Sequence, residues 1–203
     1  NKKINKGFTI MELLVVMFVS TLILTSLVVQ NNKWNDRLTV SAQAYELSLM
    51  VRQAQMYSLG VREDVGGSGD KFNVGYGVFV DMATPTQYIF FVDRDGDFRY
   101  DAGESVETKL FTRGVSLLKI CSTTVNFSLK SCSDTFLGSL VIHKYHGSFK
   151  RPDTSTRVSF FNVAYSNMTA LFRPRVEIYL RSQGGKQSVV KVEANGQVSV
   201  DDL

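Results

Sequence analysis

The residues best suited to chemistry in this 203-residue chain are the acids of one short stretch, residues 93–104, which reads DRDGDFRYDAGE. If Asp93 is counted as the first position, carboxylates stand at positions one, three, five, nine and twelve. A twelve-residue Ca²⁺ loop supplies side-chain oxygens from these positions and a backbone carbonyl from position seven. The candidate metal ligands are therefore Asp93, Asp95, Asp97, Arg99 (through its carbonyl), Asp101 and Glu104.

Two features separate this stretch from an EF-hand loop. Glycine belongs at position six of that loop, whereas Phe98 occupies it here and Gly96 stands at position four. The flanking segments also have the composition of strands rather than helices. The alternative to a metal site is a solvated turn, because Asp and Gly favour turns and Arg94 and Arg99 would neutralise part of the charge. Closely spaced carboxylates repel one another without a counter-charge, and this favours a bound cation. A structural Ca²⁺ site on a β-hairpin and a solvated turn both stay open.

Cys121 and Cys132 are the only cysteines of the chain. A bridge between them would close a short loop and stabilise the fold by at most ~3 kcal/mol. Disulfides persist in oxidising compartments, so this pairing agrees with a domain outside the cytoplasm, and two free thiols are the alternative. His143 and His146 do not complete a zinc site with them, because structural zinc sites pair cysteines two to four residues apart.

The last third of the chain is rich in basic residues interleaved with aromatic ones. Such a mixture can neutralise phosphates and stack on bases, so a nucleic-acid contact is one hypothesis. Its candidate residues are Arg173, Arg175 and Arg181. We favour the alternative of scattered surface charge, because the basic residues form no tight run. The sequence also lacks a nucleophile elbow and any acid pair marked by its spacing for acid–base catalysis, so an enzyme is not expected.

The first element that must position these residues is a long apolar run from Gly7 to Val29. As a helix, its roughly 22 residues reach about 33 Å, which matches a hydrocarbon core of about 30 Å. Lys2, Lys3 and Lys6 precede the run and favour a cytoplasmic N-terminus. A secretory signal peptide is disfavoured, because its apolar region is shorter and ends in a small-residue cleavage site.

Glu12 is the one charged residue inside this apolar run. A carboxylate in a membrane helix costs on the order of 2.5–3.5 kcal/mol, so it requires a partner. The nearest cation would be a free amine at Phe8, in the same subunit or a neighbour, if the chain were cut after Gly7. An ordinary membrane anchor does not explain this acid.

A basic leader ending in Gly7, followed by Phe8, Thr9, two apolar residues, Glu12 and a long apolar helix, resembles the N-terminus of type IV prepilins and pseudopilins. The resemblance implies that a prepilin peptidase cleaves after Gly7 and that Phe8 is then methylated. It also implies that Glu12 pairs with a neighbour's N-terminus during assembly with other pilin or pseudopilin subunits. The expected protein crosses the inner membrane once and has an extracytoplasmic C-terminal domain.

Beyond the membrane, apolar residues recur at helical spacing as far as Gly60, a usual helix end. The sequence therefore predicts one long helix, or two helices with a joint near residues 31–35. We expect the second half of this helix to pack on the rest of the protein through its apolar positions. These are Leu38, Ala42, Tyr45, Leu49, Ala54, Met56 and Leu59.

From residue 72 onward, runs of β-branched and aromatic residues alternate with turn residues, which indicates strands. The predicted strands are residues 74–80, 88–92, 115–120, 124–129, 139–143, 158–161, 176–180, 188–194 and 197–200. The last two flank Asn195 and Gly196, a dipeptide that type I′ hairpin turns prefer. The predicted class is α+β, with a long pilin-like hydrophobic helix followed by a β-rich, sandwich-like globular domain.

The predicted organisation is a leader (1–7), a transmembrane or filament-core helix (8–30), its amphipathic continuation (31–60) and a β-rich domain (61–203). This order of elements resembles the GspH/FimT type of minor pseudopilin. The resemblance implies a structural subunit of a type II secretion pseudopilus or a type IV pilus. Two alternatives stay open, namely a DNA-binding minor pilin of an uptake pilus and a membrane-anchored Ca²⁺-binding domain outside any pilus system.

Overall fold

The computed structural model describes residues 9–60, 63–64, 74–123, 130–133, 144–150, 159–166, 169–172 and 174–203. Within these ranges the chain forms one helix, α1 (Ile10–Leu59), and two antiparallel sheets, which confirms the predicted α+β class. The first sheet has the strand order β3-β2-β1-β6-β7-β8, and the second has the order β11-β10-β9-β4-β5. The strands are β1 (Gly75–Asp81), β2 (Gln87–Asp93), β3 (Ser105–Leu110), β4 (Ser116–Thr123), β5 (Lys130–Cys132), β6 (Lys144–Lys150), β7 (Ser159–Ser166), β8 (Thr169–Phe172), β9 (Arg175–Arg181), β10 (Gln187–Glu193) and β11 (Val198–Asp202).

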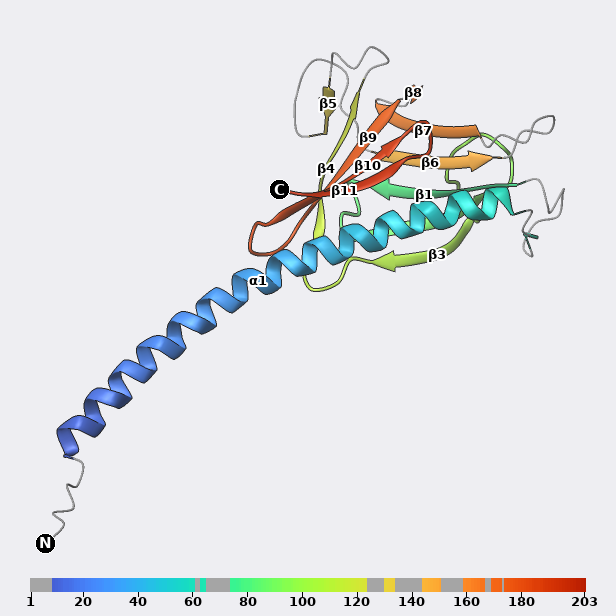
Figure 1. Ribbon diagram of the computed structural model, residues 1–203. Coiled ribbons are helices and arrows are strands. Elements are labelled where there is room, and N and C mark those ends of the chain that lie inside the picture. The colour runs from blue at the N-terminus through green and yellow to red at the C-terminus, as the bar shows by residue number, and fades with distance from the viewer. Residues whose placement is uncertain are drawn as a thin grey trace, which may run out of the picture.

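Helix α1 is continuous over 50 residues and has no break at the predicted joint near residues 31–35. Thr9 caps its start, because its hydroxyl accepts a hydrogen bond from the amide of Glu12 and so satisfies a free N–H group. The helix ends as predicted at Gly60, whose amide donates to the carbonyl of Met56. Figure 1 shows that the N-terminal half extends away from the sheets and that the C-terminal half lies along them.

One hydrophobic core lies between the C-terminal half of α1 and the two sheets. The helix enters this core through side chains that range from Ala44 to Leu47 and Met50, and it packs against β1, β6, β9, β10 and β11. Small side chains such as Ala44 and Ala54 let the helix backbone approach the sheets closely. Large sheet residues such as Tyr88 and Phe90 fill the rest of the core. The buried helix residues include Val40, Ala44, Leu47, Met50, Val51 and Ala54.

The helix therefore packs on the domain as predicted, but not through the predicted apolar positions. Among those positions only Ala54 is buried, and the others are exposed to solvent. The exposed positions are Leu38, Ala42, Tyr45, Leu49, Met56 and Leu59. The physical reason is that this half of α1 has two apolar faces, and the sheets cover the face that carries Val40, Ala44, Leu47 and Val51.

The strand predictions are confirmed where the alternation of apolar residues is clear. The segments predicted at 74–80, 88–92, 115–120 and 176–180, and the C-terminal hairpin, correspond to β1, β2, β4, β9, β10 and β11. The segment predicted at 158–161 overlaps β7, whereas those at 124–129 and 139–143 lie outside the described residues. Strands β3, β5, β6 and β8 were not predicted from the sequence. Charged residues and glycine interrupt the apolar pattern of β3 (SVETKL) and β6 (KYHGSFK).

Candidate functional site

The candidate assembly site is the start of α1. Gly7 and Phe8, the predicted cleavage and methylation residues, lie outside the described residues. Glu12 stands in the first helical turn and is exposed. Among the residues that the structure describes, no cation lies within ion-pair distance of its carboxylate. The charge partner that a carboxylate needs in an apolar setting is therefore not supplied by this part of the subunit.

The segment Ile10–Val28 of α1 is long and apolar enough to cross a membrane. Its 19 residues have a mean hydropathy of 2.3, and none of them is buried against the rest of the protein. At about 1.5 Å per residue the segment is about 28 Å long, close to the thickness of a hydrocarbon core. The hydroxyls of Ser20, Thr21 and Thr25 donate to backbone carbonyls of the preceding turn, so they need no water partner.

The Asp-rich loop joins β2 to β3 and begins with a buried acid, Asp93. The two carboxylate oxygens of Asp93 accept hydrogen bonds from the amides of Gly96 (2.7 Å) and Phe98 (3.1 Å). Asp95 and Asp97 each accept a hydrogen bond from the amide two residues further on. The backbone of the loop therefore turns around the carboxylates of Asp93, Asp95 and Asp97 and donates its amides to them. One carboxylate oxygen from each of Asp93, Asp95 and Asp97 lies within 4.8 Å of the others.

Glu104 closes this loop at its far end. Its two oxygens accept hydrogen bonds from the amides of Arg94 (2.8 Å) and Asp101 (3.0 Å). Neither Glu104 nor Asp101 belongs to the close group of three carboxylates. The structure thus brings three of the predicted ligands together, and these could supply part of the six to eight oxygens that Ca²⁺ takes.

The backbone of the loop is closer to a Ca²⁺ loop than its sequence suggests. Phe98, which stands where an EF-hand loop has glycine, has a φ of 65° and so occupies the left-handed region. Gly96 also has a positive φ, at 77°. Bulky residues rarely adopt this conformation, so the amide hydrogen bond from Phe98 to Asp93 helps to hold the turn. The missing glycine therefore does not change the direction of the chain at position six.

Two contacts fasten the loop to the domain. The ring of Tyr100 packs on Phe79 and Phe91, with centroid distances of 4.9 and 5.7 Å, on the face of the first sheet opposite the main core. The guanidinium of Arg94 binds the carboxylate of Asp64, in the segment between α1 and β1. Arg94 is thus bonded to Asp64, but its charge also interacts with Glu104, and Arg99 lies 3.8 Å from Asp97, so both arginines offset part of the charge of the loop as the turn hypothesis expected. Sequence reasoning missed Asp64 and Tyr100, since no local pattern links them to the loop.

The acids of the loop lie in surroundings that disfavour their ionised forms. The pKa of Asp93 is raised to about 6, chiefly by burial and also by the charges of Glu104 and Asp95, against the lowering effect of the Gly96 and Phe98 amides. Burial also raises the pKa of Glu104. A bound cation would favour the ionised forms and offset this cost.

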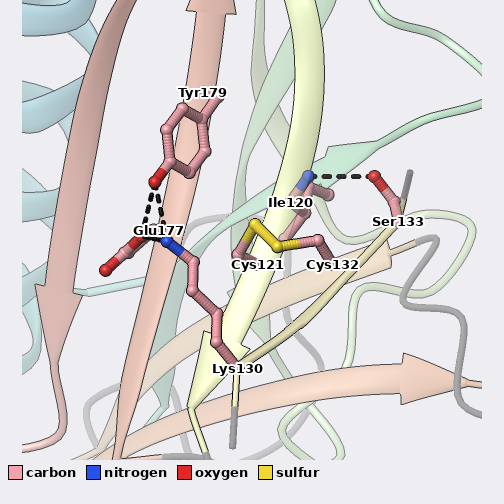
Figure 2. Close-up of a disulfide and its surroundings, with 7 residues drawn as sticks. All are labelled: Ile120, Cys121, Lys130, Cys132, Ser133, Glu177 and Tyr179. Atoms are coloured by element: carbon pink, nitrogen blue, oxygen red, sulfur yellow. Dashed lines mark hydrogen bonds and ion pairs between the residues drawn. A yellow bond between two sulfur atoms is a disulfide. The ribbon is translucent and has the colours of Figure 1, made fainter. Parts of the chain in front are cut away.

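Cys121 of β4 and Cys132 of β5 form a disulfide, which confirms the predicted pairing. The two residues lie directly opposite each other on neighbouring strands, so the bond fastens the short edge strand β5 to the sheet. Figure 2 shows the bridge beside a polar cluster, in which the ammonium of Lys130 donates to the carboxylate of Glu177 and to the hydroxyl of Tyr179. The two hydrogen bonds of Lys130 join β5 to β9 across β4. Together with the disulfide they form a clamp that fastens β5 to the second sheet.

The predicted nucleic-acid residues do not form one patch in the described part of the chain. Arg173 lies outside it. Arg175 donates to the carboxylate of Glu193 at 2.5 Å, so its charge is paired. Arg181 stands at the other end of β9, about 20 Å away at roughly 3.3 Å per residue.

The described residues form a long helix whose first half is apolar enough to cross a membrane and whose second half packs on a disulfide-bonded β domain, which suggests a membrane-anchored protein with a C-terminal domain. Residues 2–28 match the family model of the prokaryotic N-terminal methylation motif, which supports a type IV prepilin or pseudopilin. That motif implies processing by prepilin peptidase and assembly with other pilin subunits, and it points to a structural subunit rather than an enzyme. The match covers the N-terminal segment alone and does not distinguish the GspH/FimT subtype. No curated protein and no solved structure matches the chain.

Proposed function

We propose that this protein is a minor pilin or pseudopilin, a structural subunit that assembles into a pilus or a type II secretion pseudopilus. In this proposal α1 holds the subunit in the inner membrane until cleavage after Gly7 and methylation of Phe8. The observation that carries the proposal is the methylation motif on a helix whose apolar half makes no contact with its own domain. Such a helix needs lipid or other helices around it, and a filament core would supply the helices.

Glu12 has a defined role in this proposal. Cleavage after Gly7 creates an α-amine on Phe8, and that amine can neutralise the Glu12 carboxylate of a neighbouring subunit. Because an unpaired carboxylate among apolar helices is costly, only the register that joins the two charges is favourable. Glu12 would therefore set the register of assembly.

The test is the substitution Glu12→Leu in the full chain, expressed together with its filament system. The variant is expected to insert in the membrane and to be cleaved as the natural chain is, yet to be poorly incorporated into filaments. Met17→Leu is the control, because it changes an apolar residue of the same segment without changing charge. Normal incorporation of Glu12→Leu into filaments would contradict the proposed pairing of Glu12 with a neighbouring N-terminus.

The proposed subtype is the GspH/FimT type of minor pseudopilin. Its support is the order of elements: a long helix, the Gly-Tyr-Gly-Val sequence of β1, an aromatic β2 that runs into the Asp-rich loop, and a C-terminal hairpin. Co-purification of filament components with the tagged full chain tests which assembly the subunit belongs to. Secretion-system subunits in the eluate would indicate a pseudopilus, and pilus subunits would indicate a type IV pilus.

We further propose that the Asp-rich loop binds Ca²⁺ as a structural ion. The support is the group of three carboxylates within 4.8 Å and the left-handed backbone at position six. After chelation, addition of Ca²⁺ to the detergent-solubilised chain should raise its thermal unfolding temperature. Asp95→Ala should abolish this rise, because it removes one of the three carboxylates, whereas Asp101→Ala, outside the close group, should retain it. An unchanged unfolding temperature in the natural chain would identify the loop as a hydrogen-bonded turn.

A further inference from the structure

Four exposed cations gather at the end of the domain that lies nearest to the membrane segment of α1. They come from the helix and from two loops that are far apart in the sequence. The ion pairs among the described residues involve none of the four. This group, here called the basic rim, consists of Arg37 on α1, Arg113 between β3 and β4, and Arg181 and Lys186 at the turn between β9 and β10.

The contacts of the turn between β9 and β10 fix the position of the basic rim along α1. Within this turn, the hydroxyl of Ser182 donates to the carboxylate of Asp36 on the helix (2.7 Å). Gly184 packs directly on the same carboxylate, because a Cβ atom added at Gly184 would collide with it. The loop that carries Arg113 lies beside the turn, since a Cβ atom at Gly114 would stand 2.8 Å from a side chain of the turn. The basic rim therefore has a fixed place on a helix that is continuous from the membrane segment onward.

This place is close to the headgroups of the leaflet from which α1 emerges. Figure 1 shows the turn between β9 and β10 at the end of the domain from which the N-terminal half of the helix extends. Asp36 lies eight residues beyond Val28, the end of the membrane segment, and so about 12 Å further along the helix axis. The polar layer on each side of a hydrocarbon core is roughly 5–8 Å thick. The turn therefore stands roughly 4–7 Å from the outer edge of the headgroups, within the Debye length of about 8 Å at physiological ionic strength.

The charge at this end of the domain suits an anionic surface. Two carboxylates lie beside the basic rim, those of Asp36 and Asp202, and each accepts a hydrogen bond from a serine hydroxyl (2.7 Å). The four cations outnumber these two carboxylates, so the rim has an excess of positive charge. Membrane proteins usually concentrate Lys and Arg on the cytoplasmic side of the bilayer. An excess of cations on the other side is explained if they contact anionic headgroups, which favour each nearby Lys or Arg by about fivefold in the binding constant.

We propose that the basic rim binds anionic phospholipid headgroups of the leaflet from which α1 emerges, and so holds the domain against the bilayer while the subunit is in the membrane. This inference rests on the proposed function for the membrane placement of α1. Because both loops of the rim lie on the domain side of the helix, the attraction also tilts α1 toward that side. A tilt of about 20° is usual for membrane helices, and it brings Arg113, Arg181 and Lys186 closer to the headgroups.

Nucleic acid is the other polyanion that exposed cations can bind. It matches the basic rim less well, because it would have to enter the space of roughly 4–7 Å between the turn and the headgroups. Phospholipids already stand at that place wherever α1 spans a bilayer. The two polyanions are separated by the experiment below.

Photo-crosslinking of the full chain in lipid nanodiscs tests the proposal. Benzoylphenylalanine replaces Gln183, an exposed residue of the turn between β9 and β10. It should form lipid adducts, and these should be about fivefold or more abundant in nanodiscs of phosphatidylglycerol and phosphatidylcholine in equal parts than in phosphatidylcholine alone. Gln197 is the matched control, because it is the same residue type, is exposed and lies at the far end of the same sheet. Equal adducts from positions 183 and 197, or equal adducts in the two bilayers, would overturn the proposal.

Charge variants of the crosslinking chain supply a second measurement. The double variant Arg181→Gln, Lys186→Gln should lose the extra adducts seen with phosphatidylglycerol, as should the natural rim in about 1 M salt, where the Debye length falls to about 3 Å. The double variant Arg181→Lys, Lys186→Arg keeps both charges and should keep the adducts. Because all these side chains are exposed, the thermal unfolding of the variants should match that of the natural chain. Adducts that persist after the charges are removed would overturn the electrostatic contact.

Two further outcomes separate this proposal from its neighbours. If duplex DNA at the same phosphate concentration abolishes the lipid adducts, the basic rim prefers nucleic acid and lipid docking is overturned. If the chain inserts in both bilayers without any dependence on phosphatidylglycerol, the docking fails while the proposed function stands. If the chain inserts in neither bilayer, the membrane placement itself fails, and the proposed function fails with it.

Discussion

The guanidinium of Arg94 donates two hydrogen bonds to the carboxylate of Asp64, at 2.6 and 3.0 Å. A third, from Arg94 to the carbonyl of Gly103, measures 2.5 Å. Asp64 lies in the segment that follows α1, whereas Arg94 and Gly103 lie at the two ends of the Asp-rich loop. The Arg94 side chain therefore joins both ends of the loop to Asp64.

Arg94→Ala should lower the free energy of unfolding by about 1–3 kcal/mol, because it removes charge-assisted hydrogen bonds from the nearly buried Asp64. Chemical denaturation of the detergent-solubilised chain measures this loss. Arg99→Ala is the matched control from the same loop. Its guanidinium lies 3.8 Å from Asp97 and both side chains are well exposed, so the loss should be roughly 0–1 kcal/mol. Equal losses in the two variants would contradict the anchoring role of Arg94.

The stability of the metal-free domain should depend on the ionisation of Asp93. Its pKa of about 6 in the folded protein lies above the ordinary value of 3.8, so folding favours the protonated form. This contribution is fully present below about pH 4 and is lost as the pH rises through about 6. With a chelator present, the free energy of unfolding should therefore fall over this range. The fall should be smaller in Asp93→Asn, and a flat profile in the natural chain would count against the buried carboxylate.

Ca²⁺ and protons should compete for the same loop. A cation favours ionised carboxylates, so Ca²⁺ binding at a pH below the Asp93 pKa of about 6 must displace a proton. The apparent Ca²⁺ affinity should then fall as the pH is lowered through this value. Isothermal titration in buffers of different ionisation enthalpy would measure both the affinity and the proton release. An affinity that does not change across this range would show that Asp93 is not a ligand.

Loss of the disulfide should destabilise the second sheet at its β5 edge. The bridge closes a loop with a sequence separation of 11 residues, and the chain-entropy model gives about 3 kcal/mol for a loop of this size. The double variant Cys121→Ala, Cys132→Ala should therefore lose up to ~3 kcal/mol of unfolding free energy. Reduction should destabilise the natural chain by a similar amount and leave the double variant unchanged. Equal unfolding of oxidised and reduced natural chain would contradict the clamp.

The sequence was most informative where one local pattern has one physical cause. Gly60 ends the helix as predicted, because it follows the last periodic residue. A hairpin joins β10 to β11 as predicted, but its turn is not of type I′, because Gly196 has a positive φ and Asn195 does not. The amide of Gly196 instead donates to the carbonyl of Glu193, with Ala194 and Asn195 between them. The pairing of Cys121 with Cys132 was one of two open predictions, and the chain has no other cysteine with which either could pair.

The face of α1 that packs on the domain was not predictable from the sequence. The spacing of apolar residues shows where the apolar faces of a helix lie, but not which face contacts the rest of the protein. The sheets cover Ala44 and Ala54, which allow close approach, and leave Leu49 and Met56 exposed. Strand β3 was missed for a related reason. It is an edge strand, almost wholly exposed, so its sequence carries little apolar alternation.

The ligand set of the Asp-rich loop was predictable only in part. Spacing identifies which residues carry oxygens, but it does not show which oxygens the backbone already uses. Glu104 accepts hydrogen bonds from two amides and stands outside the group of three carboxylates. Asp64 comes from a segment far away in the sequence, so only the folded chain shows that it holds Arg94.

The central claim, that the chain is processed as a prepilin and assembled as a filament subunit, is tested most directly by the intact mass and N-terminal sequence of the membrane-extracted protein. The account predicts a chain that starts at a methylated Phe8. A chain that retains Lys2 to Gly7 would contradict it, because the amine that is proposed to pair with Glu12 would never form.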